Sequence, residues 1–167
     1  MRKAIEVEFQ INTEEDKSIL SVISKNEELK VNTHCVYVYS LADDDILYPI
    51  EKGKVIYIGE AWRQNEPTGK RFTGHITKTS NEGNNFTTNR AISSYYYSGF
   101  KLKLEVYCLD NVNTEQARKE QEKKLYTLHA KKYGALPIGQ GSTGENYTPE
   151  NLKTIIGSNV ENSAITP

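Results

Sequence analysis

The sequence has almost no net charge, few cysteines and no long apolar run. It contains 21 lysine and arginine residues against 22 aspartate and glutamate residues, so the formal charge is −1. The strongly basic balance that usually accompanies nucleic-acid binding is therefore missing. No apolar run approaches membrane-spanning length, and no secretory signal is visible after Met1. We therefore expect a cytoplasmic protein.

The two cysteines, Cys35 and Cys108, each lie within an alternating apolar run. Cysteine in such a setting usually acts as a small buried hydrophobe, so both are expected to be reduced and structural. The hydrophobic content is only 37%, but eleven tyrosines can bury large areas while keeping a polar group. A chain of 167 residues suits one compact domain.

Charge is unevenly distributed along the chain. The first third is acidic, whereas basic residues gather in the later part, at Lys70, Arg71, Lys78, Arg90, Lys101, Lys103, Lys123 and Lys124. This distribution is compatible with a basic face that binds nucleic acid, and equally with an ordinary solvated surface.

Periodicity predicts a strand, then a helix, then a hairpin in the first third of the chain. Residues 4–10 alternate with period two, and Thr13 with Asp16 resembles a capping box opening a helix that continues through Ile23. The next two strands are predicted at 35–41 and 55–61, as an antiparallel pair with a long acidic connection.

The rest of the chain predicts loops, two helices and one strand. A short helical piece carrying Arg71 and His75 is expected within the loops of 60–88. A helix is predicted at 88–98, a strand at 101–109, and a long helix from a cap at Asn113 or Thr114 to Tyr133, ended by Gly134. The expected inward stripe of the long helix consists of Ala117, Leu125, Tyr126 and Leu128. A final helix is expected at Thr148-Pro149-Glu150.

These elements predict an α+β fold, with a small mixed or antiparallel sheet flanked by helices. We expect one domain over 1–167. It comprises an N-terminal strand-helix extension (1–33), a core (34–146) and a C-terminal helix and tail (147–167).

The two predicted strands of the hairpin carry a recognisable pattern. Gly53-Lys54-Val55-Ile56-Tyr57-Ile58-Gly59 leads into and forms most of the second strand, and Cys35-Val36-Tyr37 begins the first. Together they resemble the signature of the GIY-YIG nucleases, in which a first strand ends in a tyrosine and a second reads Gly-Lys-x-Tyr-Ile-Gly. Cys35 replaces the family's glycine, which leaves Tyr39 as an alternative to Tyr37, and the connecting loop is longer than usual.

Three further elements extend the resemblance. Arg71 and His75 have the spacing that many members show on the first helix after the second strand, four apart and so on one helical face. Glu122, with Ala117 before it and Leu125 after it, matches the family's metal-binding glutamate, with Glu120 as fallback. Pro137 followed by Gln140 and Asn146 partly matches a proline and asparagine close to the site.

The same residues suit phosphodiester hydrolysis on chemical grounds. The reaction needs an activated water, cationic groups for the charge on the phosphoryl oxygens, and help at the leaving oxygen. Glu122 is a hard oxygen ligand suited to Mg²⁺, and Arg71 can hold a phosphate through its planar guanidinium. The resemblance implies that Tyr37 is the base and that Tyr57 contacts phosphate or water. The residues alone leave His75 as an alternative base.

The resemblance implies a Mg²⁺-dependent DNA endonuclease, and the compact chain is most similar to the restriction enzymes of the family. Such an enzyme is expected to cut double-stranded DNA as a homodimer on a palindromic site. A repair, recombination or phage nuclease, and a binding module without hydrolysis, are the alternatives. Further DNA contacts are expected from Lys70, Arg90, Gln140 and Asn146.

Other aromatic and histidine residues have simpler interpretations. The run Tyr95-Tyr96-Tyr97 suits either base stacking or core packing. His34 and His129 have no assigned role and are interpreted as structural.

Overall fold

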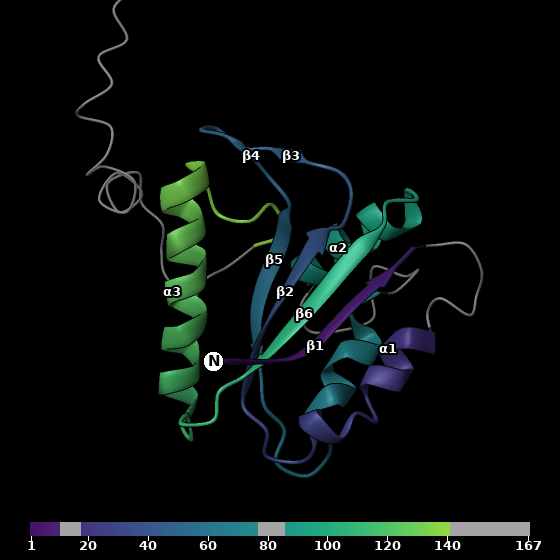
Figure 1. Ribbon diagram of the computed structural model, residues 1–167, viewed down its shortest axis with the longest axis vertical. Helices are drawn as coiled ribbons and strands as arrows, with labels where there is room; N and C mark the ends of the chain where they lie inside the picture. Colours follow the sequence, from purple (N-terminus) through teal and green to yellow (C-terminus); the bar gives the residue numbers. More distant parts are fainter. Residues whose placement is uncertain (11–17, 77–85, 141–167) are drawn as a thin grey trace, which may run out of the picture.

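A four-stranded sheet forms the centre of the protein (Figure 1). The computed structural model describes residues 1–10, 18–76 and 86–140. The sheet is antiparallel throughout, which confirms the predicted α+β fold. In spatial order its strands are β1 (Arg2–Phe9), β6 (Leu102–Cys108), β2 (Cys35–Leu41) and β5 (Val55–Ala61).

The predicted strands are reproduced closely. The bounds of β2 and β5 agree with the prediction, and β6 lies inside the predicted 101–109. β1 begins and ends slightly earlier than the predicted 4–10. It pairs with β6 along its length, so this part of the N-terminal extension is an edge of the central sheet.

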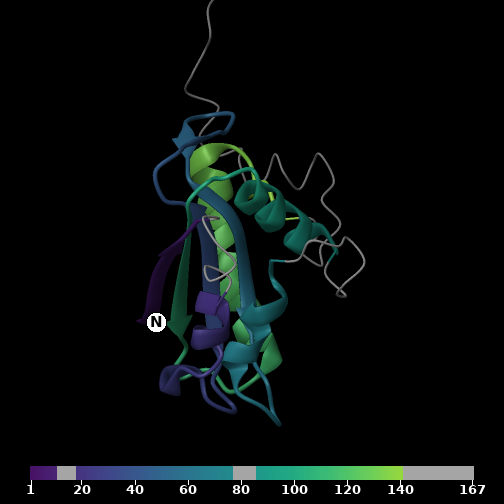
Figure 2. The same cartoon turned by 90° about the vertical axis from the view of Figure 1, so that its right-hand side faces the viewer.

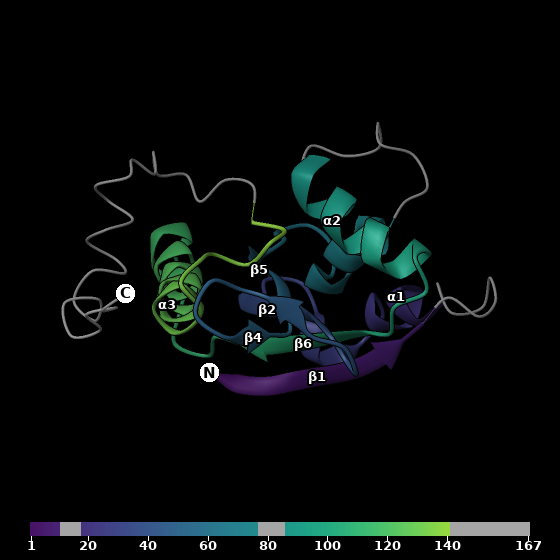
Figure 3. The same ribbon diagram turned by 90° about the horizontal axis from the view of Figure 1, so that it is seen from above.

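One face of the sheet carries the main core. Tyr37 and Tyr39 of β2 lie opposite Val106 and Leu104 of β6, and all four side chains are buried. Three helical segments cover this face (Figure 3): α1 (Ser18–Ile23), the 3₁₀ helix η3 (Thr68–Gly74) and α2 (Phe86–Tyr97). Their buried contributions to the core are Leu20, Ile23, Phe72, Ile92 and Tyr96.

The core decides how the tyrosine run and the two cysteines are to be interpreted. Tyr96 is 1% exposed within it, so core packing explains the centre of the tyrosine run. Cys35 and Cys108 lie opposite each other in the β2–β6 register, and both are buried free thiols as predicted. The proposed cap at Thr13 and the helix at 148–150 lie outside the described residues.

The long helix α3 (Glu115–Tyr133) packs against β5 and β2 on the opposite face, as Figures 1 and 2 show. Its limits confirm the sequence prediction. The Thr114 side chain accepts a hydrogen bond from the Ala117 N–H at 3.2 Å, and Gly134 ends the helix at φ 77°. None of the described helices is both long and apolar enough to cross a membrane.

The predicted inward stripe of α3 is partly wrong. Leu128 is 62% exposed, and the buried residues of the helix are Arg118, Tyr126, His129 and Ala130. The error has a physical cause, because two of the four buried residues are polar and find hydrogen-bond partners inside the protein. The spacing of apolar residues alone therefore predicts the wrong buried side of α3.

The connection between β2 and β5 contains a small hairpin where the sequence suggested only a loop. β3 (Ile46–Leu47) pairs with β4 (Lys52–Gly53). The Ile50 N–H donates to the Tyr133 carbonyl at 3.1 Å, which holds the hairpin against the end of α3 (Figure 1).

The chain after α3 returns to the outer edge of β5. The Gly139 N–H donates to the Ile56 carbonyl at 2.7 Å, and the Ile58 N–H donates to the Gln140 side-chain oxygen at 3.3 Å. A Cβ at position 139 would lie 2.8 Å from the Ile56 oxygen, so glycine permits this approach. Residues 137–140 thus cover part of this edge.

Candidate active site

Tyr37 and Tyr57 meet over a glycine. Tyr37 of β2 lies directly opposite Gly59 of β5, and its ring centroid is 5.9 Å from that of Tyr57. A Cβ added to Gly59 would lie 2.5 Å from Cζ and Oη of Tyr37 and 2.7 Å from Cε1 of Tyr57. The absence of a side chain at Gly59 therefore leaves room for the buried phenol of Tyr37 to lie over β5 at this position.

The substitution Gly59→Ala is expected to reduce the stability of the protein. The new methyl group must displace the two rings, and overpacking of this kind costs about 1–3 kcal/mol. The measurement is thermal unfolding. Gly74→Ala is the matched control, because a Cβ there meets no atom within 4 Å. Equal behaviour of the two variants would contradict this interpretation.

His75 lies beside the two tyrosines of β2. It is the C-cap of η3 and is 3% exposed. Its ring centroid is 5.2 Å from that of Tyr37, and its Nδ1 is 3.0 Å from the Tyr39 hydroxyl. The two candidate tyrosines thus have different surroundings. The Tyr39 hydroxyl forms a hydrogen bond with His75, whereas the Tyr37 ring lies over Gly59 and beside Tyr57.

The expected arrangement of Arg71 and His75 on one helical face is wrong. The segment is a 3₁₀ helix with about three residues per turn, so residues four apart point in different directions. His75 is buried and Arg71 is partly exposed. The positive charge of Arg71 nevertheless acts on this cluster, because it opposes the effect of burial on the pKa of Tyr37.

Burial governs protonation in the cluster. It lowers the pKa of His75 to about 3, with a smaller effect from Arg71, so the imidazole is neutral at physiological pH. Burial also raises the pKa of Tyr37 well above 10. The Nε2 atom of His75 is buried and has no hydrogen-bond partner among the described residues. The cluster is thus a neutral, largely desolvated group of hydroxyls and one imidazole beside a guanidinium.

Glu122 belongs to α3, on the other face of the sheet. The Glu122 side chain is partly buried. Burial, with a smaller contribution from the negative charge of Glu60, raises the pKa of Glu122 to about 7. The charge of Glu122 in turn contributes to the raised pKa of Tyr37, so the two groups lie within electrostatic reach. The fallback, Glu120, is exposed and accepts a hydrogen bond from Gln116 at 3.1 Å. The geometry therefore favours Glu122.

No family model, curated protein or solved structure matches this chain. The resemblance to GIY-YIG nucleases stays a prediction based on the motif residues. Among the residues of this prediction, Tyr37 contacts the rings of Tyr57 and His75, and the charges of Arg71 and Glu122 act on the pKa of Tyr37.

The donor chemistry of the site fits one hard divalent cation. No hydrogen bond or ion pair to Glu122 is found among residues 1–10, 18–76 and 86–140, and burial raises its pKa even though the charges of Lys119 and Arg118 act in the opposite direction. The same residues contain no group of three or more His, Cys, Asp or Glu side chains that could hold a metal. A cation bound to Glu122 would thus take most of its ligands from water and phosphate, a mode typical of Mg²⁺.

The predicted DNA-contacting residues lie in different settings. Lys70 is exposed and 3.1 Å from Glu66, and Arg90 is exposed on α2. The side-chain oxygen of Gln140 is engaged with β5, and Asn146 lies outside the described residues. Lys101 and Lys103 of the suggested basic face are paired with Glu8 and Glu6.

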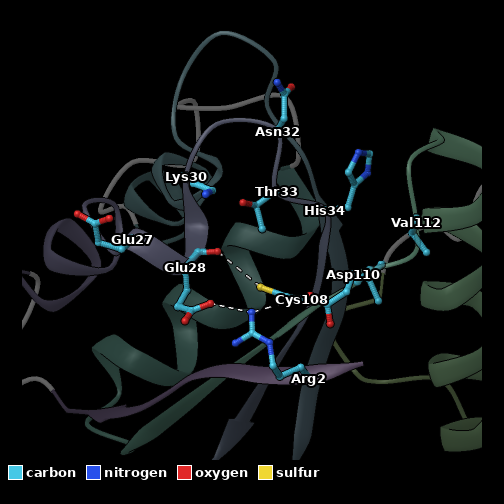
Figure 4. A pocket seen from close by; sticks show the side chains of 11 residues that line it. Arg2, Glu27, Glu28, Lys30, Asn32, Thr33, His34, Cys108, Asp110 and Val112 are labelled. Carbon is cyan, nitrogen blue, oxygen red and sulfur yellow. Dashed lines mark hydrogen bonds and ion pairs between the residues drawn. The ribbon is translucent and has the colours of Figure 1, made fainter.

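A polar pocket of about 410 Å³ lies at the end of β1 and β6, apart from the tyrosine cluster (Figure 4). Arg2 crosses it to Glu28 at 2.7 Å, and Cys108 and His34 contribute to its wall. None of the catalytic residues predicted from the sequence lines this pocket.

Sequence reasoning missed a second polar group next to the site. Glu60 follows Gly59 directly and pairs with Arg118, which also contacts His34. The local pattern contains no signal for these contacts, because they depend on the strand register and on the position of α3.

Proposed function

We propose that this protein is a divalent-metal-dependent DNA endonuclease that hydrolyses phosphodiester bonds. The observation that carries the proposal is the convergence on Tyr37. Tyr57 and His75 contact its ring, Arg71 acts on it with positive charge, and the Glu122 carboxyl lies within electrostatic reach.

These groups match the needs of the reaction. A water oxygen attacks phosphorus, the bond to the leaving oxygen breaks, the water gives up a proton and the leaving oxygen gains one. The guanidinium of Arg71 would hold the non-bridging phosphate oxygens and stabilise their growing charge. A Mg²⁺ ion held by Glu122 would supply Lewis-acid stabilisation of the phosphate. Tyr57 would contact the phosphate or the attacking water.

Tyr37 and His75 are both candidates for the proton acceptor. His75 is neutral and has a free ring nitrogen, but a pKa of about 3 makes it a weak base. Tyr37 is protonated in the isolated protein because burial raises its pKa. The charge of Arg71 and of a bound cation would lower that pKa, and this favours Tyr37 when substrate and metal are present.

Within this class we propose a site-specific restriction endonuclease that acts as a homodimer on a palindromic duplex. The β3–β4 hairpin, inserted between β2 and β5, is our candidate for part of the recognition surface. A structure-specific nuclease of repair, recombination or phage origin uses the same chemistry and is the second candidate.

Incubation with supercoiled plasmid and Mg²⁺ tests the proposal. Discrete linear fragments are expected for a site-specific enzyme, and cleavage confined to junctions or flaps would assign the structure-specific type. Intact DNA with a retarded gel band would identify a binding module, and neither cleavage nor retardation over a panel of plasmid and branched substrates would refute the proposal. Reactions with EDTA provide the metal control.

The Mg²⁺ requirement is expected to depend on pH. Because the Glu122 pKa is raised to about 7, a proton competes with the cation below that pH. The half-saturating Mg²⁺ concentration should therefore fall about tenfold per pH unit between pH 5 and 7 and level off above pH 7. Cleavage rates measured over a Mg²⁺ series at each pH provide the test. A half-saturating concentration constant from pH 5.5 to 8 would contradict the assigned role of Glu122.

A further inference from the structure

Arg118 is a buried charge in an otherwise highly charged helix. It is 5% exposed, and it is the one buried residue of α3 before Tyr126. Burying a guanidinium is costly unless charged and hydrogen-bonding partners compensate it. The first half of α3 is therefore held to the sheet through Arg118 rather than through buried apolar side chains.

The partners of Arg118 come from both central strands. Its Nε donates to the Glu60 carboxylate of β5, and its Nη1 lies 3.1 Å from Nδ1 of His34, next to β2. Because arginine only donates, His34 accepts at Nδ1, so its ring is neutral with the proton on Nε2. One planar guanidinium thus joins α3 to the ends of β2 and β5.

Trp62 completes this cluster. The guanidinium carbon of Arg118 lies 5.6 Å from the centroid of the Trp62 ring, and the ring of His34 stacks on Trp62 at 5.6 Å. His34 and Trp62 flank the paired residues Cys35 and Ala61, so the β2–β5 register brings them together. We call Arg118, Glu60, His34 and Trp62 the arginine clamp.

The arginine clamp lies beside the proposed cation ligand. Glu122 is four residues after Arg118, about one helical turn along the same side of α3. Glu60 follows Gly59, over which the Tyr37 ring passes. The clamp therefore connects the backbone that carries Glu122 to the strand that supports Tyr37.

We propose that Arg118 is a positioning residue that fixes the place of Glu122 relative to β2 and β5 by holding the first half of α3 against these strands. The catalytic role of this positioning rests on the proposed function. Its effect on cation binding can be tested in the absence of DNA. Loss of the clamp lets the helix shift, and Glu122 then binds the cation less tightly.

Trp62 allows a direct test, since it is the only tryptophan of the chain. Saturable quenching of its fluorescence by Mn²⁺, in the full-length protein without DNA, measures cation binding near Glu122. Arg118→Lys keeps the charge but loses the planar fork that reaches two partners at once. We expect the half-saturating Mn²⁺ concentration to rise at least tenfold, and the Mg²⁺ concentration needed for cleavage to rise in parallel. DNA affinity in EDTA should stay unchanged.

Three variants complete the design. Lys119→Arg is the matched control, because it keeps the positive charge that acts on Glu122 and the exposed pairing with Glu115, and it should bind Mn²⁺ like the wild type. Glu122→Gln should abolish saturable quenching. Glu60→Gln keeps an oxygen acceptor for Arg118 and should give an intermediate shift of about threefold. It replaces Arg118→Lys if the latter lacks a cooperative unfolding transition.

The outcomes separate the two proposals. A folded Arg118→Lys protein with a Mn²⁺ midpoint within threefold of wild type overturns the positioning role, as does the absence of saturable quenching in the wild type. If Arg118→Lys does not fold, a wild-type midpoint in Glu60→Gln overturns it. A weaker midpoint in a protein that cuts no DNA supports the clamp and refutes the nuclease.

Discussion

Glu122→Gln is expected to lower Mg²⁺-dependent DNA cleavage by at least about 100-fold, because the metal supplies several kcal/mol of transition-state stabilisation. The amide keeps the shape of the side chain but has no negative charge with which to hold a divalent cation. The protein should remain folded, since the neutral amide resembles the protonated carboxyl that burial already favours. Single-turnover cleavage rates over a Mg²⁺ series measure the effect.

Glu120→Gln is the control for this substitution. Glu120 lies on the same helix, two residues away, but it is exposed and accepts a hydrogen bond from Gln116. Its replacement should leave cleavage within about twofold of wild type, as is usual for exposed positions without a special role. A Glu120→Gln protein that loses activity while Glu122→Gln retains it would move the metal ligand to Glu120.

Tyr37→Phe should reduce cleavage by about 10²–10⁴-fold, the range usual for loss of a general base. Only the hydroxyl is removed, so the packing of the ring against Tyr57 and Phe72 is kept. DNA binding in the presence of Ca²⁺ should therefore persist. Single-turnover rates at saturating enzyme separate the chemical step from binding.

Tyr39→Phe tests the alternative tyrosine. This change removes the hydrogen bond to Nδ1 of His75 and should cost about 1–3 kcal/mol of stability, because a buried polar partner is left unsatisfied. Cleavage should fall less than tenfold. Full activity of Tyr37→Phe, combined with inactivity of His75→Ala, would assign the proton acceptor to His75.

The strands were readily predicted because their pattern is local. Alternation of apolar and polar residues, together with the turn residues around them, located β2 and β5 without error. The ends of α3 were predicted as well, because the hydroxyl of Thr114 and the left-handed backbone of Gly134 are local capping signals. The β3–β4 hairpin, with two residues in each strand, is too short to give a periodic signal.

The side of α3 that faces the sheet could not be predicted from apolar spacing. Arg118 is buried because Glu60 and His34, far away in the sequence, compensate its charge, and Leu128 points outward instead. Likewise, the spacing of Arg71 and His75 predicted one helical face only if the segment were α-helical, and it is a 3₁₀ helix. Motif spacing thus located the candidate residues, whereas their contacts depend on tertiary packing.

The cover over the β5 edge limits how copies of this protein can associate. An uncovered rim of a sheet offers peptide groups to strands of other molecules. Gly139 and the Gln140 side chain already occupy such groups at Ile56 and Ile58, so a second copy is blocked from extending the sheet there. Joining of two sheets edge to edge is therefore favoured at β1, the opposite rim of the four-stranded sheet, which would leave both β5 strands at the outer ends of the joined sheet.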